Sequence, residues 1–201
     1  MKDLTRPPNH PNQETRLGTV EIRSDDGENR ISGYAAKFNT LSENLGGFRE
    51  TIQVGAFDHV LVDDVRALFN HSPSMILGRT KAGTLHLEAD AIGLRYCIDP
   101  PDTQYARDLH KSIRRGDVTQ SSFAFQVDRD DWQEDDDGRI IRTIKTIKRL
   151  FDISPVTYPA YPDTSVAARS VLQFRDNAYA KPVRQSQVAR RRAFLYLKTT
   201  A

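Results

Sequence analysis

The sequence is poor in the residues on which several classes of protein depend. Its 201 residues include a single cysteine, Cys97, which excludes an internal disulfide and suits a reducing compartment. No apolar run approaches the roughly 18 residues of a membrane-spanning helix, and residues 1–16 lack the apolar segment of a secretory signal peptide. No cysteine–histidine cluster has zinc-site spacing, and no glycine-rich phosphate loop is present. We therefore expect no metal, no cofactor and no membrane partner.

Charged residues are unevenly distributed along the chain. Residues 169–201 contain eight Lys and Arg against one Asp, a net charge of +7, and residues 1–16 carry +1. The formal total of +2 therefore leaves −6 for residues 17–168, and the 38% hydrophobic composition suits one globular domain there. We predict a flexible, proline-containing arm over 1–16, a folded domain over 17–168 and a flexible basic tail over 169–201.

Alternating apolar and polar residues predict strands over most of the body. A short helix is expected after Gly55. A longer helix is predicted to begin after Asp102 or Thr103 as N-cap and to end at Gly116. The expected fold is mainly β with a few helices (α+β), a mostly antiparallel β-barrel or strongly curved sheet flanked by helices. The expected strands lie at 17–23, 31–38, 65–70, 75–78, 85–89, 93–98, 120–126 and 139–153.

An acidic run at 128–137 lies between the last two expected strands. Its Asp137-Gly138 step is a strong signal for a β-hairpin turn. The run lacks the glycine-centred spacing of a calcium loop. We interpret it as the solvated tip of a hairpin rather than as a metal site.

The strand at 120–126 contains the best candidate for a nucleophile. Side chains alternate between the two faces of a strand, so Ser121 shares a face with Phe123 and Phe125, while Ser122 points the other way. Small neighbours on the second face leave room for another molecule beside Ser122. A serine alone is more often an ordinary strand residue, so this interpretation requires a base and an acid.

His71 and Asp152 are the best candidates for those two roles. His71 stands at the end of an expected strand, before the chain break expected at Ser72-Pro73, where its ring could face a cleft or simply bind the backbone. Asp152 shares a strand face with the apolar Leu150, and a buried carboxylate needs a partner. The alternative for Asp152 is a surface position balanced by neighbouring basic residues.

Other reactive side chains have simpler interpretations. His59 and His110 lie among charged residues of expected amphipathic helices, which favours solvated positions. His86 alternates with polar residues, as on the outer face of a strand. Cys97 lies between Tyr96 and Ile98, which favours a small buried hydrophobe over a reactive thiolate.

Five blocks of sequence occur in the order found in one protein family. Together they resemble the prohead (capsid maturation) proteases of tailed phages, of the HK97 type, which are related in fold to the herpesvirus assemblins. The resemblance covers about residues 33–168. The blocks are Leu68-Phe69-Asn70-His71-Ser72-Pro73, Leu77-Gly78-Arg79-Thr80, Gly83-Thr84-Leu85, Ser122-Phe123-Ala124-Phe125 and Leu150-Phe151-Asp152-Ile153-Ser154-Pro155-Val156-Thr157-Tyr158-Pro159-Ala160.

The resemblance implies an assemblin-like β-barrel and a serine endopeptidase with Ser122 as nucleophile, His71 as base and Asp152 as acid. Arg79 and backbone N–H groups near the serine are candidates for the oxyanion donors. The sequence departs from the family pattern at two positions. Asp152 stands where glutamate is commoner, which requires a closer approach to His71, and Ala124 replaces a commoner glycine beside the nucleophile.

The expected substrate is the scaffolding (delta) segment of the major capsid protein, inside the prohead assembling in the host bacterial cytoplasm. Proteases of this kind also cleave themselves, so the basic tail is expected to be removable and to act as a packaging signal. Portal contact and self-association are further expectations, and nucleic acid is expected to bind at most weakly, through the tail. The alternative functions are a non-enzymatic scaffold with a protease-like fold and a nucleic-acid-binding module based on the tail.

Overall fold

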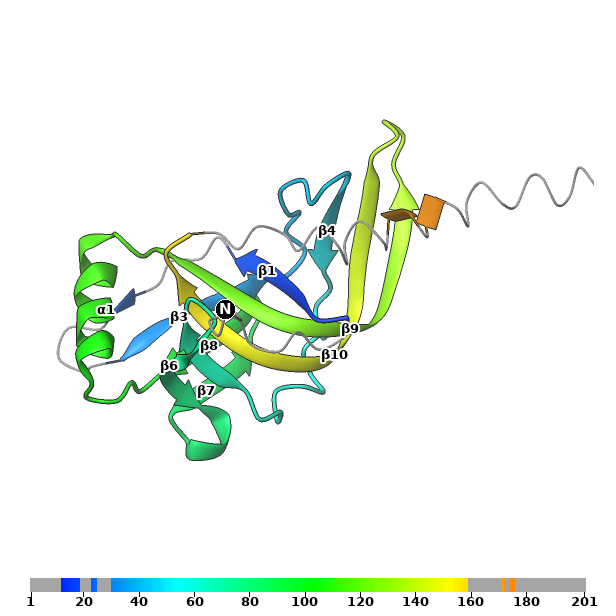
Figure 1. Ribbon diagram of the computed structural model, residues 1–201. Coiled ribbons are helices and arrows are strands. Elements are labelled where there is room, and N and C mark those ends of the chain that lie inside the picture. Colours follow the sequence, from blue (N-terminus) through cyan, green and yellow to red (C-terminus); the bar gives the residue numbers. More distant parts are fainter. Residues whose placement is uncertain (1–11, 19–22, 25–29, 159–170, 173, 176–201) are drawn as a thin grey trace, which may run out of the picture.

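A computed structural model describes residues 12–18, 23–24, 30–158, 171–172 and 174–175 (Figure 1). The described part is mainly strand with one α-helix. In chain order the elements are β1 (Glu14–Gly18), β2 (Arg23–Ser24), β3 (Ile31–Lys37), β4 (Phe48–Ile52), β5 (Arg66–Phe69), β6 (Ser72–Arg79), a 3-10 turn (Thr80–Ala82), β7 (Leu85–Ala89), β8 (Gly93–Ile98), α1 (Gln104–Arg115), β9 (Gln120–Glu134) and β10 (Ile140–Val156).

These strands form two sheets. The first has the order β1-β9-β10-β5-β6, with β4 also pairing with β10, and the second has the order β2-β3-β8-β7. Most pairs are antiparallel, as predicted, but β10 runs parallel to β4 near its start and parallel to β5 near its end. Neither sheet closes on itself among the described residues, so the predicted barrel stays a prediction.

The long hairpin of β9 and β10 forms the centre of the first sheet, because β1, β4 and β5 all pair with one of its two strands (Figure 1). Its turn lies where the sequence predicted it, with Gly138 at a φ of 75°. The Asp135 carboxylate accepts hydrogen bonds from the backbone N–H groups of Asp137 and Arg139, which closes the turn. Only the end of the acidic run, from Asp135 on, forms the tip of the hairpin; residues 128–134 belong to β9, which is longer than the predicted strand.

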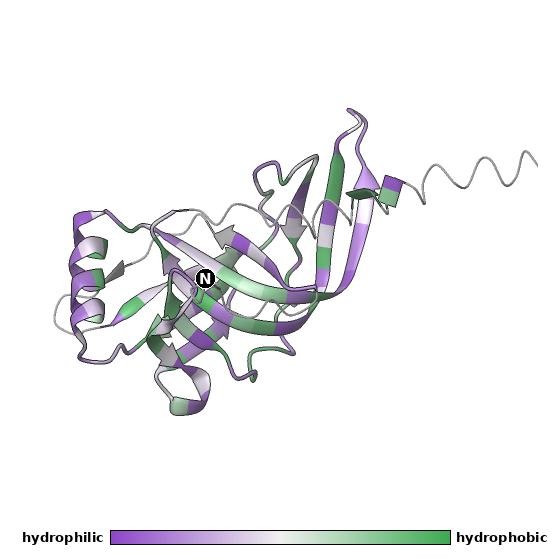
Figure 2. Cartoon of the chain, viewed as in Figure 1, coloured by the Kyte–Doolittle hydropathy of each residue, from purple (hydrophilic) through white to green (hydrophobic). Residues whose placement is uncertain are grey.

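Helix α1 also agrees with the sequence. Thr103 precedes it in an extended conformation, and Gly116 ends it in the left-handed region at a φ of 81°. The helix turns its hydrophobic side towards the sheets, where Ala106, Leu109 and Ile113 are buried (Figure 2). No described helix is long and apolar enough to cross a membrane.

The helix expected after Gly55 does not form. Residues 54–62 make separate turns instead, with hydrogen bonds such as that from the Val60 N–H to the Phe57 carbonyl at 2.9 Å. Phe57 and Val60 are nevertheless buried, because these turns press them against the core. The apolar residues expected on one side of that helix, Phe57, Val60 and Leu61, are buried or half-buried, but their spacing did not specify a regular helix.

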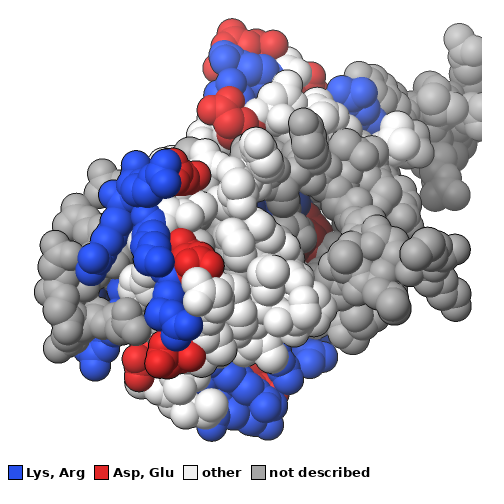
Figure 3. Space-filling view, turned by 60° about the vertical axis from the view of Figure 1, so that its left-hand side comes forward, with Lys and Arg blue, Asp and Glu red and all other residues white. Residues whose placement is uncertain are grey.

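The core lies beneath the part of β9 that carries Ser122. The rings of Phe123 and Phe125 stack at 4.8 Å between centroids, and Phe57 meets Phe123 edge-on at 5.9 Å. Charged side chains gather towards the margins of the face seen in Figure 3, while uncharged side chains cover most of its centre. Phe123 and Phe125 therefore pack into the core from one face of β9, and Ser122 lies on the other face of the same strand.

Two described segments lie beyond the predicted limits of the folded domain, and the predicted limit at residue 168 itself lies outside the described residues. Glu14–Gly18 form β1, although residues 1–16 were expected to be a flexible arm; residues 1–11 lie outside the described part. Val171 is buried and Phe174 stacks on Trp132 of the hairpin at 5.8 Å, although both belong to the predicted tail. Apolar and ionic contacts with the hairpin hold these short segments, and residues 176–201 are not described.

Candidate active site

Ser122 points away from the core, on the face that the strand alternation predicted. It pairs across the sheet with Ser154 of β10, and its side chain lies on the same side as that residue. Ser121 points to the opposite face, where its hydroxyl contacts the Tyr96 hydroxyl at 2.6 Å in the buried interior. Burial raises the pKa of Tyr96 above its ordinary value, and this phenol stays neutral beside Ser121. Ser121 is thus part of the core and Ser122 is not.

His71 reaches Ser122 from the tight turn between β5 and β6. Asn70 and His71 are the two central residues of this turn, with φ values of 54° and 56°, as a two-residue hairpin of the I′ type requires. The predicted break at Ser72-Pro73 is instead the start of β6. His71 therefore lies in a tight hairpin turn and not, as predicted, at the end of a strand.

Asn70 clamps this turn to the end of β10. Its N–H donates to the Pro155 carbonyl at 3.0 Å, its carboxamide nitrogen donates to the Thr157 hydroxyl at 3.0 Å, and its carboxamide oxygen accepts from the Thr157 N–H at 2.8 Å. The strand that carries Asp152 therefore also fixes the turn that carries His71.

Ser122, His71 and Asp152 form one chain of hydrogen bonds. The Ser122 Oγ lies 2.8 Å from His71 Nε2, and His71 Nδ1 lies 2.5 Å from Asp152 Oδ1. Asp152 is only 5% exposed, so the alternative of a surface aspartate does not hold. An irregularity in the pairing between Leu150 and Asp152 puts Asp152 on the face of Ser122, and the prediction that it shares a face with Leu150 is wrong. The His71 ring contacts side chains rather than simply the backbone. A serine hydroxyl, an imidazole and a buried carboxylate that are hydrogen-bonded in this order can transfer a proton away from the serine.

Ser154 is a site residue that the sequence analysis did not single out. Its hydroxyl donates to Asp152 Oδ1 at 2.9 Å and lies 3.3 Å from His71 Nδ1. It follows Asp152 by two positions in a strand, so the alternation that places Asp152 also places Ser154 on the same face. The hydrogen bond from Ser154 to Asp152 holds the carboxylate towards the imidazole.

The remaining candidates lie apart from this chain of hydrogen bonds. The Arg79 guanidinium makes two bonds of 2.7 Å to the Asp64 carboxylate, which lower the pKa of Asp64 to about 2. A contribution of Arg79 to an oxyanion hole would require this pair to open. His59 and His86 are exposed, whereas His110 is buried, contrary to expectation, because it lies on the inner side of α1.

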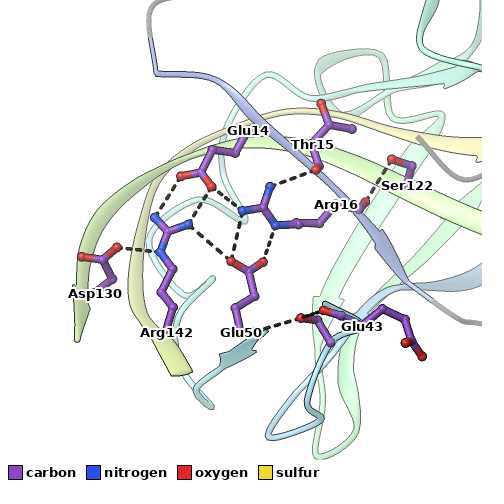
Figure 4. A network of polar contacts seen from close by, with 9 residues as sticks. Glu14, Thr15, Arg16, Glu43, Glu50, Ser122, Asp130 and Arg142 are labelled. Atoms are coloured by element: carbon purple, nitrogen blue, oxygen red, sulfur yellow. Dashed lines mark hydrogen bonds and ion pairs between the residues drawn. The ribbon is translucent and has the colours of Figure 1, made fainter. Parts of the chain in front are cut away.

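A buried ionic cluster lies beside the nucleophile, on the core side of β1 (Figure 4). Glu14 and Arg16 of β1 meet Glu50 of β4 and Arg142 of β10, and all four are at most 5% exposed. Burial raises the pKa of Glu14, but the hydrogen bond from Arg142 and the charges of Arg16 and Arg142 outweigh it, so the pKa lies below its usual 4.5. Glu14 is therefore ionised at neutral pH.

Within the described ranges, no group of three or more His, Cys, Asp or Glu side chains is arranged to hold a metal ion. The side chains that meet at Ser122 are a hydroxyl, an imidazole and a carboxylate. In a peptide hydrolase these groups would act as nucleophile, general base and orienting acid.

Comparison with known proteins gives two matches. The family model described as caudovirus prohead serine protease matches residues 18–177. The prohead protease of Enterobacteria phage HK97 is 27% identical over 151 residues, which cover 74% of this chain and 64% of that protein. The match thus spans slightly less than two thirds of the relative's length. No solved structure gives a significant match.

Proposed function

Because the chain belongs to the family of caudovirus prohead serine proteases, we propose that it is a serine endopeptidase of phage capsid maturation. Its proposed substrates are the scaffolding (delta) segment of the major capsid protein and the chain itself, inside the prohead as it assembles in the host cell. The observation that carries this proposal is the chain of hydrogen bonds from Ser122 through His71 to Asp152. An assemblin-like barrel, portal contact and self-association remain parts of the proposal that rest on the family resemblance.

The proposed reaction is acyl transfer in two steps. The Ser122 Oγ attacks the carbonyl carbon of the scissile peptide bond while His71 Nε2 takes the hydroxyl proton. The tetrahedral intermediate then breaks its C–N bond, and His71 returns the proton to the departing amine. Water attacks the acyl–serine ester with the same help from His71, which releases the new carboxyl end and restores the hydroxyl.

Asp152 orients the imidazole throughout this cycle. It accepts a hydrogen bond from the N–H at Nδ1, which leaves the lone pair of Nε2 facing the serine, and its charge stabilises the imidazolium that forms in each step. Ser154 and Asn70 act as positioning residues, because the first holds the carboxylate and the second holds the turn that carries the ring. The departure from glutamate at this position is compatible with the proposal, since the shorter side chain already lies within hydrogen-bond distance of the ring.

The oxyanion of the intermediate needs hydrogen-bond donors. Arg79 remains a candidate for this role in the proposal, together with backbone N–H groups near Ser122. The ion pair of Arg79 with Asp64 is partly exposed. If Arg79 moved from Asp64 to the oxyanion when substrate binds, the Asp64 carboxylate could therefore be hydrated by water.

The test is co-expression of the full chain with the major capsid protein of the same phage, followed by intact mass spectrometry of both proteins. Ser122→Ala should abolish cleavage of both, because loss of a triad nucleophile lowers the rate on the order of a millionfold. Ser121→Ala is the matched control. It removes the neighbouring hydroxyl from the opposite face and should keep the same cleavage products, with some loss of stability from the unpaired Tyr96 hydroxyl.

Capsid protein that stays whole with the wild-type chain would favour the alternative of a non-enzymatic scaffold. Equal cleavage by the wild type and Ser122→Ala would assign the proteolysis to another enzyme. Cleavage lost in both serine variants would point to a general loss of folding, which circular dichroism of the two variants detects.

A further inference from the structure

Strand β1 covers the nucleophile. It pairs antiparallel with β9 at the edge of the sheet, with Arg16 opposite Phe123 and Leu17 opposite Ser122. Ser122 is 0% exposed as a result, and its Oγ lies 3.0 Å from the carbonyl oxygen of Arg16. A peptide substrate cannot reach Ser122 while β1 occupies this position.

The contact also engages the hydroxyl proton. A carbonyl oxygen only accepts hydrogen bonds, so the Ser122 hydroxyl donates to Arg16 in this contact. The single hydroxyl proton is then directed at Arg16 and not at His71 Nε2, which lies 2.8 Å from the same oxygen. A base takes the proton only along a hydrogen bond from the hydroxyl, so this arrangement is not ready for attack.

The same contact places β1 as a substrate would lie. Extended peptides bind proteins by adding a strand to a free sheet edge, with alternate side chains entering recognition sites. Here the residue whose carbonyl touches the nucleophile is Arg16, and its side chain enters the ionic cluster (Figure 4). Glu14, two positions earlier, enters on the same face, as the alternation of a strand requires.

The recognition of these two side chains is specific in charge. The Arg16 guanidinium donates to Glu50 Oε1 at 2.5 Å and stands over the Phe125 ring at 5.8 Å. Glu14 receives two hydrogen bonds from Arg142, at 2.6 and 2.9 Å. Buried charges of this kind are strongly destabilised when one partner is lost, so only a strand with matching charges fits here.

We propose that the β9 edge is the substrate-binding site and that β1 is a built-in substrate mimic that keeps the chain latent. This inference rests on the proposed function of the chain as a protease. A substrate that replaces β1 carries a basic side chain at the residue that supplies the scissile carbonyl, bound by Glu50. It carries an acidic side chain two positions earlier, bound by Arg142.

The first test exchanges the two charges of β1 in the full chain. The Glu14→Arg/Arg16→Glu double variant keeps the composition and net charge but places each charge against a like charge of the cluster. The probe is a fluorophosphonate, which bonds through phosphorus to the Ser122 Oγ as fluoride leaves. Labelling should be at least about tenfold faster than in the wild type, because a mismatched buried pair shifts the equilibrium towards released β1.

The matched control exchanges the charges of an exposed pair. Arg95 Nη1 lies 3.7 Å from Glu88 Oε2 on the surface. The Glu88→Arg/Arg95→Glu variant should be labelled at the wild-type rate. Glu14→Gln/Arg16→Gln, which removes both charges without adding repulsion, is a second variant in case the exchange disturbs folding. It should also label faster than the wild type. Circular dichroism verifies that the variants are folded.

The second test uses two capped peptides as competitors of labelling in the charge-exchanged variant. One has the sequence of residues 12–18, Asn-Gln-Glu-Thr-Arg-Leu-Gly, and the other exchanges its Glu and Arg. The first should slow labelling of Ser122 at least about fivefold when in excess over its Kd, and the second should not. Equal competition by both peptides would overturn the proposed recognition by Glu50 and Arg142.

The two proposals fail in different ways. Wild-type labelling as fast as that of both β1 variants, absent only in Ser122→Ala, would leave the protease in place and overturn the role of β1. Absence of labelling at Ser122 in every variant, with capsid protein left whole, would overturn the proposed function and this inference together.

Discussion

Replacement of Asp152 by Asn tests the charge of the carboxylate while preserving its size. Asp152 is buried, receives a hydrogen bond from Ser154 at 2.9 Å and lies 2.5 Å from the His71 ring. An asparagine oxygen can still accept from Nδ1, so the shape of the site is kept. The substitution removes only the negative charge beside the imidazolium that forms in the reaction.

The expected loss follows from the distances. At an effective dielectric constant of about 20, two unit charges about 4 Å apart attract by about 4 kcal/mol. A further contribution comes from the tautomer, because the amide N–H₂ can turn towards Nδ1 and reverse the orientation of the ring. We therefore expect Asp152→Asn to lower kcat by about 10⁴-fold, which is about 5.5 kcal/mol in activation free energy.

The assay is the initial rate of capsid-protein cleavage, with urea unfolding of each variant as the measure of folding. Asp152→Glu is the matched control, because it keeps the charge and adds one methylene to a buried site. Overpacking of that kind costs about 1–3 kcal/mol of folding free energy, so the urea midpoint should fall while the rate stays well above that of Asp152→Asn. A rate for Asp152→Asn within tenfold of the wild type would refute the proposed role of Asp152.

Two further predictions concern charges outside the triad. The pKa of Glu14 is lowered in the folded chain, so its ionic contribution is present above pH 4.5 and is lost as the pH falls through the folded-state pKa; hydrogen exchange of the β1 amides should quicken there, and Glu14→Gln should not show this step. If Arg79 donates to the oxyanion, Arg79→Ala should slow capsid-protein cleavage by about 10²–10³-fold and Asp64→Ala should not. Equal and small effects of these two substitutions would assign Arg79 to the surface ion pair alone.

Local signals predicted several elements well. The left-handed Gly116 that ends α1 and the Asp137-Gly138 turn depend on the conformations of a few adjacent residues, so the sequence specifies them directly. Thr103 stands at the predicted start of the helix, but its side chain makes no cap hydrogen bond. The faces of Ser121 and Ser122 follow from the two-residue period of a strand in the same way. The helix expected after Gly55 is the counterexample, because apolar spacing shows which residues are buried but not how the backbone hydrogen bonds are made.

The candidate triad could be named from sequence motifs, but its geometry could not. His71 is 51 positions from Ser122 and 81 positions from Asp152 along the chain. Their meeting requires the β5–β6 turn to lie against the end of β10, which depends on pairing between distant strands. Arg79 was selected by the same motif reasoning, and only the tertiary structure revealed its partner Asp64.

By itself the sequence determined where the chain turns, which side chains share a face and which family motifs are present, because all three are properties of short segments. The tertiary structure decided what covers the nucleophile. Glu14 and Arg16 belong to a polar, proline-containing segment that resembles a solvated arm, and their charges are favourable in the interior only because Arg142 and Glu50 meet them there. The free energy of such a pair depends on burial and on a partner far along the chain, and neither can be read from neighbouring residues.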